Sequence, residues 1–358
     1  MLLLGGAFTG WFVIAVPLGR DILDNDLTLV YIGARIGLEH GWSQIYSLSL
    51  QHQLFAQLRP GAPFNDGERF LSPPPAAWLI LPTTVFGPAA AVYIWLAASV
   101  LALVAAWWIA SPGAGWHRLI WLVAAFAWYP VQYSLSLVQL DLVVLLAAVA
   151  SWKLAEQERP YLAGMVLGVS VLKPQLTLAL PLVLLAAGRW RIAAAWAASA
   201  GILAALSLIV IGQAGLGDYR TLLSEAQHVV NNRYFTGAYM VGPGPLSYVV
   251  QGAVLAAGVA GAFLNRHSGL ARIFALGLVT TALGATYWHL QDYAILVGAA
   301  WLFWREDPPA WQLWWLLVVA AGGELAWPLR PLPILVGLAV WMGYLVLPPR
   351  HAVRRAPA

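Results

Sequence analysis

Ionisable and amide residues interrupt an otherwise apolar chain at a few short places. They are Asp21, Asp24 and Asp26, then Gln139 and Asp141, then Lys173 and Gln175, and finally His289, Gln291 and Asp292. A carboxylate can take a proton from a hydroxyl, and a Lys or His can neutralise a phosphate leaving group. Such groups are costly in or near a membrane, so they mark function more often than surface charges do. They predict a polar reaction on a lipid-borne substrate.

Two other kinds of site use the same residue types. A transporter also gathers charges in a cavity, but it is expected to carry them near the membrane midplane on broken helices, often in paired repeats. Neither feature is clear here, although Lys173-Pro174 interrupts an apolar run. The three Asp residues between 21 and 26 resemble a metal-binding carboxylate cluster, but matching acids are not evident elsewhere. We therefore expect no metal and no other cofactor.

Composition places these residues in a membrane protein. Hydrophobic residues make up 61% of the chain and charged residues only 9%, far below the charged content of soluble domains. The many Trp and Tyr residues suit membrane–water boundaries. The absence of Cys excludes disulfides, thiolate nucleophiles and zinc–cysteine sites. Lys and Arg stand singly between apolar runs, which argues against a nucleic-acid partner and makes them reporters of topology.

The apolar runs predict an all-α bundle of about twelve transmembrane helices. The expected spans are 2–18, 88–110, 118–134, 138–154, 161–173, 175–188, 191–211, 246–264, 270–287, 293–304, 311–327 and 332–347. Residues 76–86, between a Pro run and Gly87, are too short to cross and are expected to lie in the interface or to dip into the membrane. If they crossed, every later orientation would be reversed.

The distribution of basic residues predicts the orientation of the bundle. Most Lys and Arg fall in short loops on one side, which makes both termini cytoplasmic. Residues 1–348 are then one membrane domain, and residues 349–358 a basic cytoplasmic tail. The long segments 19–75 and 212–245 are expected to be outer loops, and within the first of them 27–39 and 47–58 show the near-helical spacing of interfacial helices. All the chemistry-bearing residues named above emerge on this outer side.

The order of the motifs resembles that of glycosyltransferase family 87. The first-loop residues Asp26, Tyr31, Gly41 and Tyr46, the segment Ser72-Pro73-Pro74, and the pair Gln139 and Asp141 resemble successive family elements, with Val138 where Gly is usual. The run from Ala163-Gly164 through Gly168 to Lys173-Pro174 is similar to another, with Arg189-Trp190-Arg191 following it. His289 and Asp292 are similar to a late element. The resemblance covers roughly residues 20–300.

This resemblance implies roles for particular residues. Asp26 would be the catalytic base, with Asp24 as its nearest competitor. Lys173 and His289 would bind the donor phosphate, although Lys173 can also be read as a snorkelling side chain at a helix end, and His289 as a structural polar residue. The supporting cavity residues would be Asp24, Tyr31, Gln139, Asp141, Gln175 and Asp292. The segment from His228 to Tyr234 is a further candidate for the acceptor site.

The resemblance also implies a fold and an activity. The fold would be a GT-C-like helical bundle with a long first outer loop that carries interfacial helices. The expected activity is that of an inverting hexosyltransferase that moves a sugar, with mannose foremost, from a polyprenyl-phosphate donor to a lipid or glycan acceptor. The reaction would take place on the outer, periplasmic or extracellular, face of the cytoplasmic membrane. The alternative is a transporter or ligase of polyprenyl-linked glycans.

Overall fold

The computed structural model describes residues 2–64, 69–242 and 244–348, and these form helices and the turns between them. Helix accounts for 79% of the chain and no strand forms within the described ranges, which confirms the all-α class. The tail predicted at 349–358 lies outside the described residues. The extent of the membrane domain, 1–348, stays a prediction.

The described residues of the first half of the chain form ten helices. These are α1 (Leu2–Gly10), α2 (Val16–Arg20), α3 (Asp26–Glu39), α4 (Leu48–Leu58), α5 (Pro74–Ile80), α6 (Pro88–Ala110), α7 (His117–Ala127), α8 (Tyr129–Ser136), α9 (Asp141–Glu156) and α10 (Pro160–Leu167). A π-helical stretch, Trp11–Ala15, joins α1 to α2. Short 3-10 turns cover Trp42–Gln44, Leu81–Phe86 and Gly168–Leu172.

The second half contributes the remaining helices of the described chain. These are α11 (Leu180–Ala186), α12 (Trp190–His228), α13 (Gly237–Val241), α14 (Pro245–Leu264), α15 (Leu270–Gly284), α16 (Leu296–Trp304), α17 (Ala310–Glu324), α18 (Ala326–Leu329) and α19 (Leu332–Val346). Further 3-10 turns cover Pro174–Leu176, Val230–Arg233 and Gln291–Ile295.

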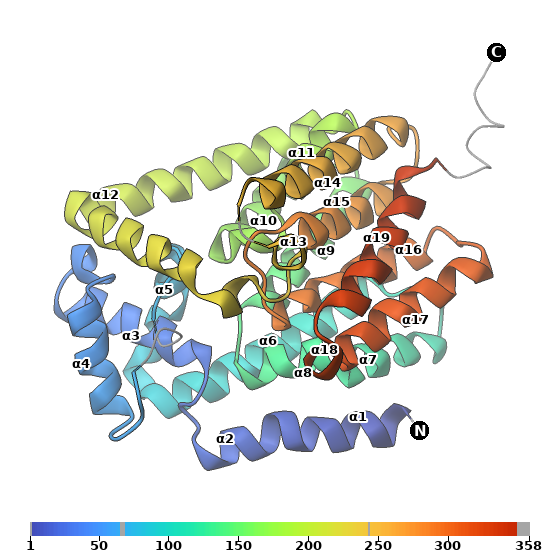
Figure 1. The fold of residues 1–358 in the computed structure, drawn as a ribbon. Helices are drawn as coiled ribbons and strands as arrows, with labels where there is room; N and C mark the ends of the chain where they lie inside the picture. The colour runs from blue at the N-terminus through green and yellow to red at the C-terminus, as the bar shows by residue number, and fades with distance from the viewer. Residues whose placement is uncertain (1, 65–68, 243, 349–358) are drawn as a thin grey trace.

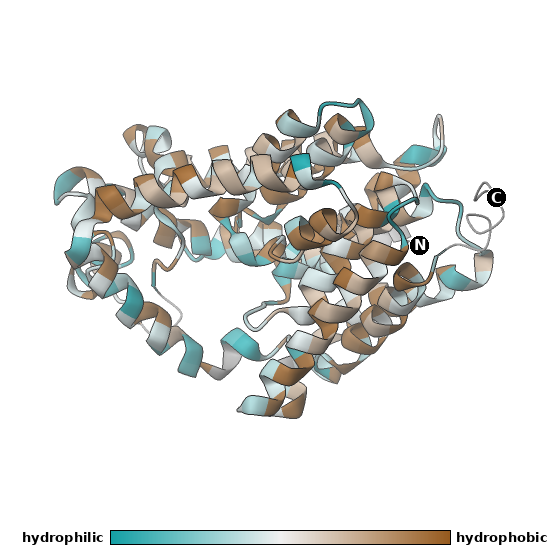
Figure 2. Cartoon of the chain, turned by 90° about the horizontal axis from the view of Figure 1, so that it is seen from above, coloured by the Kyte–Doolittle hydropathy of each residue, from teal (hydrophilic) through white to brown (hydrophobic). Residues whose placement is uncertain are grey.

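The helices form a bundle whose centre is α15. Residues Ala271 to Ala282 of this helix are all buried. In Figure 1, α1 and α2 run along one edge of the bundle, α12 runs along the opposite edge, and α3, α4 and α5 gather at one end. Figure 2 shows that the long helices are mainly hydrophobic, whereas most hydrophilic residues lie in connections and at helix ends. Apolar packing thus surrounds the segments that carry the polar motifs.

Among the described residues, three helices, α6, α12 and α14, are long and apolar enough to cross a membrane by length and composition. Several expected spans are interrupted instead. The span expected at 118–134 is divided into α7 and α8, because Trp128 is extended and Pro130 stands in the first turn of α8 without an N–H to donate. The total of about twelve spans therefore stays a prediction.

The outer loop expected at 212–245 is largely helical, which corrects that prediction. α12 continues to His228 after a bend at Gly212, whose φ of 62° and ψ of −168° are open to glycine but strained for other residues. The second part of α12 packs on the first long loop: the rings of Tyr219 and Tyr46 lie 4.5 Å apart, and Glu225 pairs with Arg69. The charged residues in the second part of α12 interrupt the apolar pattern, so the sequence indicated a loop there.

The first long loop contains the two helices expected from its spacing, but α3 is not a surface helix. Ten of its 14 residues are buried, and Leu27, Ile32 and Ile36 are almost fully excluded from solvent. They pack in an apolar cluster with residues of α4, α5 and α6. This packing holds the start of α3, and with it Asp26, against the bundle.

Candidate active site

Asp26 occupies the first turn of α3. Asn25, in extended conformation, caps the helix by accepting a hydrogen bond at Oδ1 from the backbone N–H of Thr28 over 3.2 Å. The backbone N–H of Asp26 donates to the carbonyl of Leu137 at 3.1 Å, which ties α3 to the turn between α8 and α9. A carboxylate at this position also interacts favourably with the helix dipole.

The turn between α8 and α9 brings Gln139 to Asp26. Val138 adopts a φ of 50°, in the left-handed region that glycine favours and that is strained for a β-branched residue. Glycine, the usual residue in the motif that this turn resembles, would adopt this conformation without strain. The Nε2 group of Gln139 donates a hydrogen bond to Asp26 Oδ2. The strained turn therefore directs an amide at the candidate base.

The orientation of the Gln139 amide follows from its second partner. Lys173 Nζ lies 3.0 Å from Gln139 Oε1, and because an ammonium can only donate, this atom must be the amide oxygen. The NH₂ group then faces Asp26. Gln139 is thus a bridge that links an ammonium to a carboxylate.

Lys173 lies at the centre of the polar contacts. It stands between two 3-10 turns, and its Nζ is 2.5 Å from Asp141 Oδ1 and 2.6 Å from Asp292 Oδ1. Both carboxylates are completely buried. Their other oxygens also have partners: Ser134 Oγ donates to Asp141 at 3.1 Å, and the backbone N–H of His289 donates to Asp292 at 2.9 Å. Ion pairs and hydrogen bonds of this kind offset the cost of burying the charges.

Close helix packing positions the segment that carries Lys173. A methyl group added at Gly164 would collide with the carbonyl of Ile192, and one added at Gly168 would lie 2.7 Å from Ser199 Cβ. Both partners belong to α12. The glycines of this motif therefore let α10 and the turn after it lie directly against α12.

His289 lies in the connection between α15 and α16. Its Nε2 is 3.0 Å from Asn232 Oδ1, while Asn232 Nδ2 donates to the carbonyl of Ala226 at 2.8 Å. The amide is thereby oriented with its oxygen toward the ring, so Nε2 carries the proton and Nδ1 is left as an acceptor. Burial, reinforced by the nearby Lys173 ammonium, lowers the pKa of His289 to about 4. The imidazole is therefore neutral near pH 7.

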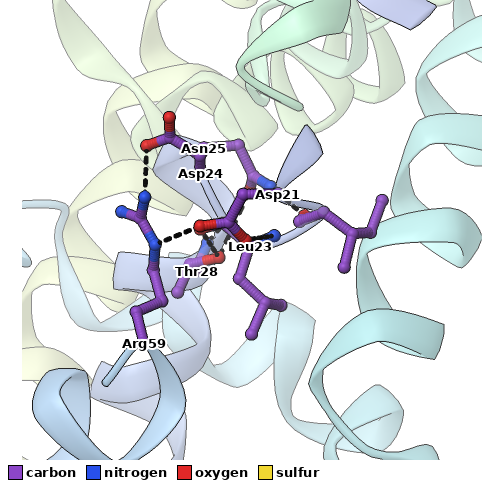
Figure 3. A network of polar contacts seen from close by, with 7 residues as sticks. Asp21, Leu23, Asp24, Asn25, Thr28 and Arg59 are labelled. Atoms are coloured by element: carbon purple, nitrogen blue, oxygen red, sulfur yellow. Dashed lines mark hydrogen bonds and ion pairs between the residues drawn. The ribbon is translucent and has the colours of Figure 1, made fainter. Parts of the chain in front are cut away.

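Asp21 and Asp24 share a network of polar contacts with Arg59 (Figure 3). Arg59, which follows the last turn of α4, pairs with Asp21 Oδ2 at 2.9 Å and with Asp24 Oδ1 at 2.8 Å. The side chain of Asp24 is 61% exposed. Through Arg59 these acids attach α4 to the segment before α3. Among the described residues, no three His, Asp or Glu side chains form a group that could hold a metal ion.

Besides Asp24, two more of the expected cavity residues lie apart from the Lys173 contacts. The hydroxyl of Tyr31 accepts from Arg35 at 3.3 Å and lies 3.5 Å from the carbonyl of Thr84, within the apolar packing of α3. Gln175 is half-buried, and in the described part of the chain no hydrogen bond joins it to Lys173. Conversely, Ser134 and Asn232 contact the site. No sequence signal singled out Ser134, while Asn232 falls in the segment proposed for the acceptor.

Comparison with known proteins identifies the family. The model of glycosyltransferase family 87 matches residues 70–323, which is well over half of the chain. The match includes Gln139, Asp141, Lys173, His289 and Asp292, whereas Asp26 precedes it. No match was found among curated proteins or among solved structures. The chain thus belongs to glycosyltransferase family 87 and is a membrane glycosyltransferase.

Proposed function

We propose that the protein transfers a hexose, with mannose the first sugar to test, from a polyprenyl-phosphate donor to a hydroxyl of a lipid or glycan acceptor. Transfer would take place on the outer face of the cytoplasmic membrane and without a metal. The observation that supports this proposal is the Gln139 bridge, because it links the carboxylate of Asp26 to the charged centre at Lys173. Displacement of a phosphate needs a base for the attacking hydroxyl and a cation for the leaving phosphate, and Asp26 and Lys173 supply these groups within one set of contacts.

In the proposed reaction Asp26 acts as the general base. Its carboxylate takes the proton of the acceptor hydroxyl as that oxygen attacks the anomeric carbon of the sugar. The bond between this carbon and the phosphate oxygen breaks, and polyprenyl phosphate leaves with the electron pair. Because the acceptor enters opposite the leaving group, the anomeric configuration is inverted. The transition state is oxocarbenium-like, so a nearby carboxylate lowers the barrier.

The contacts of Lys173 refine its proposed role. Lys173 Nζ donates hydrogen bonds to Gln139 and Asp141 and forms an ion pair with Asp292, so three partners already surround its three N–H groups. Contact with the donor phosphate would therefore displace one of them, and Gln139, as the neutral partner, is held least strongly. We propose that Lys173 positions Gln139 and Asp26 before the donor binds and turns to the phosphate once it is bound.

The tautomer of His289 points to a hydroxyl as its partner. A neutral ring whose Nε2–H is already bonded to Asn232 offers only the Nδ1 lone pair. This lone pair would repel a phosphate oxygen but accept a hydrogen bond from a sugar or acceptor hydroxyl. We therefore favour a hydroxyl over the donor phosphate as the ligand of His289.

The base assignment can be tested with Asp26→Asn and, as a matched control, Asp24→Asn. Purified protein in liposomes is supplied with polyprenyl-phosphate-mannose or polyprenyl-phosphate-glucose, a membrane lipid extract as the source of acceptor, and EDTA. Release of polyprenyl phosphate should fall roughly 10²–10⁴-fold in Asp26→Asn, the usual contribution of a general base. It should stay near wild type in Asp24→Asn, which loses only an exposed ion pair.

Three results would contradict the proposal. Wild-type turnover by correctly folded Asp26→Asn would exclude Asp26 as the base. Movement of labelled lipid across the vesicle membrane without consumption of donor would show a carrier instead of a transferase. Loss of turnover in EDTA, restored by a divalent cation, would contradict the metal-independent reaction.

A further inference from the structure

A second group of cations lies at the other end of α9 from Asp141. Arg118, Lys153 and Arg305, together with Trp108 and Ser111, line a cavity of about 480 Å³. α9 is 16 residues long, or about 24 Å, with Asp141 at its start and Lys153 in its last turn. The cavity is therefore separate from the candidate active site.

Shared contacts hold the three cations close together. Arg118 Nε donates to Ser111 Oγ at 2.8 Å, and Arg305 Nη1 donates to the carbonyl of the same Ser111 at 3.2 Å. The Arg305 guanidinium also lies 5.1 Å from the ring centre of Trp152, and Lys153 Nζ lies 5.8 Å from that ring. Contacts with Ser111 and Trp152 thus hold the three positive charges near one another although they repel.

No counterion for these charges is found in the part of the chain that the structure describes. The described residues that line the cavity include no acid, and none of the three cations forms an ion pair with a described residue. A second cavity, lined by Arg189 and Arg191, differs because Glu158 contributes to its lining. The charge of the first cavity is therefore suited to an anion from outside the protein.

The aromatic residues beside the cavity indicate its level in the membrane. The side chains of Trp108 and Trp116 are 67% and 65% exposed, at the end of α6 and just before α7. Exposed Trp residues at the ends of apolar helices settle at the height of lipid headgroups. The cavity therefore lies at the level of the anionic headgroups of the membrane lipids.

We propose that this cavity binds a phosphate-bearing anion, such as the headgroup of an anionic phospholipid. Arg118, held by Ser111 and by the carbonyls of Trp107 and Trp108, forms its fixed wall. The exposed Lys153 and Arg305 supply the charges that close on the phosphate. Cations near a membrane surface each contribute a factor of about five to the binding of anionic lipid.

The test compares binding of radiolabelled phosphatidylglycerol and phosphatidylcholine to the detergent-purified full chain. The double variant Lys153→Gln/Arg305→Gln should lose roughly thirtyfold in affinity for phosphatidylglycerol. Arg266→Gln, which removes an exposed cation outside the cavity, is the matched control and should bind as wild type. If the double variant folds poorly, Lys153→Gln alone should lose about fivefold.

Inorganic phosphate distinguishes the sources of the anion. Competition by millimolar phosphate would show that the phosphate group alone is bound, and lack of competition would assign the site to the intact lipid. Equal binding of the two lipids by the wild type, or unchanged affinity in the folded double variant, would overturn the proposal. An equal loss in Arg266→Gln would also overturn it, because general surface charge would then explain the binding.

Discussion

At the scale of single residues, Lys173 pairs with two carboxylates that have no access to water. Its removal would leave Asp141 and Asp292 buried side by side without a cation. Breaking such a cluster costs about 3–5 kcal/mol, because the remaining charges are unpaired. Lys173 is therefore expected to support the fold as well as the reaction.

Lys173→Met should accordingly lower the melting temperature of the detergent-purified protein strongly. Lys153→Met is the matched control, because Lys153 is exposed and forms no ion pair with a described residue. Its effect should stay within about 0.5 kcal/mol. Equal melting temperatures for Lys173→Met and wild type would show that the cluster does not stabilise the protein.

The depressed pKa of His289 predicts a pH dependence of stability. Because the folded-state pKa, about 4, lies below the value of about 6.5 in unfolded chains, the unfolded state binds a proton more readily. The stabilising effect is complete above about pH 6.5 and is lost as the pH falls toward 4. The melting temperature of wild type relative to His289→Gln should decline over this range. Parallel curves for the two proteins would contradict the burial of a neutral imidazole.

At the scale of elements, the bend in α12 decides where the first long loop is held. Beyond Gly212 the helix turns toward that loop, and Gly215 comes so close to Ser43 that an added Cβ would lie 2.8 Å from the Ser43 carbonyl oxygen. The loop includes α3, which begins at Asp26. The conformation of Gly212 therefore influences the position of Asp26, the candidate base.

Gly212→Ala should destabilise the protein by about 1–3 kcal/mol, the usual cost of a non-glycine residue in such a conformation. Gly201→Ala is its matched control within the same helix. An added Cβ has open space at both positions, but only Gly212 has a positive φ. Melting temperatures should thus fall in the first variant and stay level or rise in the second. Equal effects would mean that the bend is not strained.

At the scale of the whole molecule, two groups of charged residues lie at opposite ends of α9. The Lys173 contacts lie at the start of α9 and the cation-lined cavity lies near its end. α1 begins and α19 finishes at the same end of the bundle (Figure 1). If the helices cross the membrane as the basic residues predict, the first group faces outward and the second faces the cytoplasm.

The orientation can be measured directly, because the chain contains no Cys. Single Cys residues placed at exposed Ser49, on α4, and exposed Gln157, after α9, report the two ends. A membrane-impermeant maleimide should label Ser49→Cys in intact cells and Gln157→Cys only after permeabilisation. The natural Cys-free chain serves as the blank. The reverse pattern would place Asp26 on the cytoplasmic side and exclude an outer-face reaction.

The sequence by itself determined the helical class and the family. Apolar runs at the length of helices leave little choice of secondary structure, and α6 forms over the 88–110 range expected for it. The ordered motifs indicated glycosyltransferase family 87, which the family match confirms. These features depend on local composition and on order along the chain, so one sequence is sufficient to find them.

Only the tertiary structure decided which side chains meet. The first-loop motif favoured Asp26 over Asp24, but only the fold shows that Asp24 pairs with Arg59 and that Asp26 receives Gln139 from a distant turn. Tyr31, close in sequence to Asp26, packs elsewhere, while Asn232 reaches His289. Such pairings depend on irregular backbone at positions such as Val138 and on helix contacts between distant segments. Neither is encoded in hydrophobic periodicity, so the side-chain pairings of the candidate site follow only from the fold.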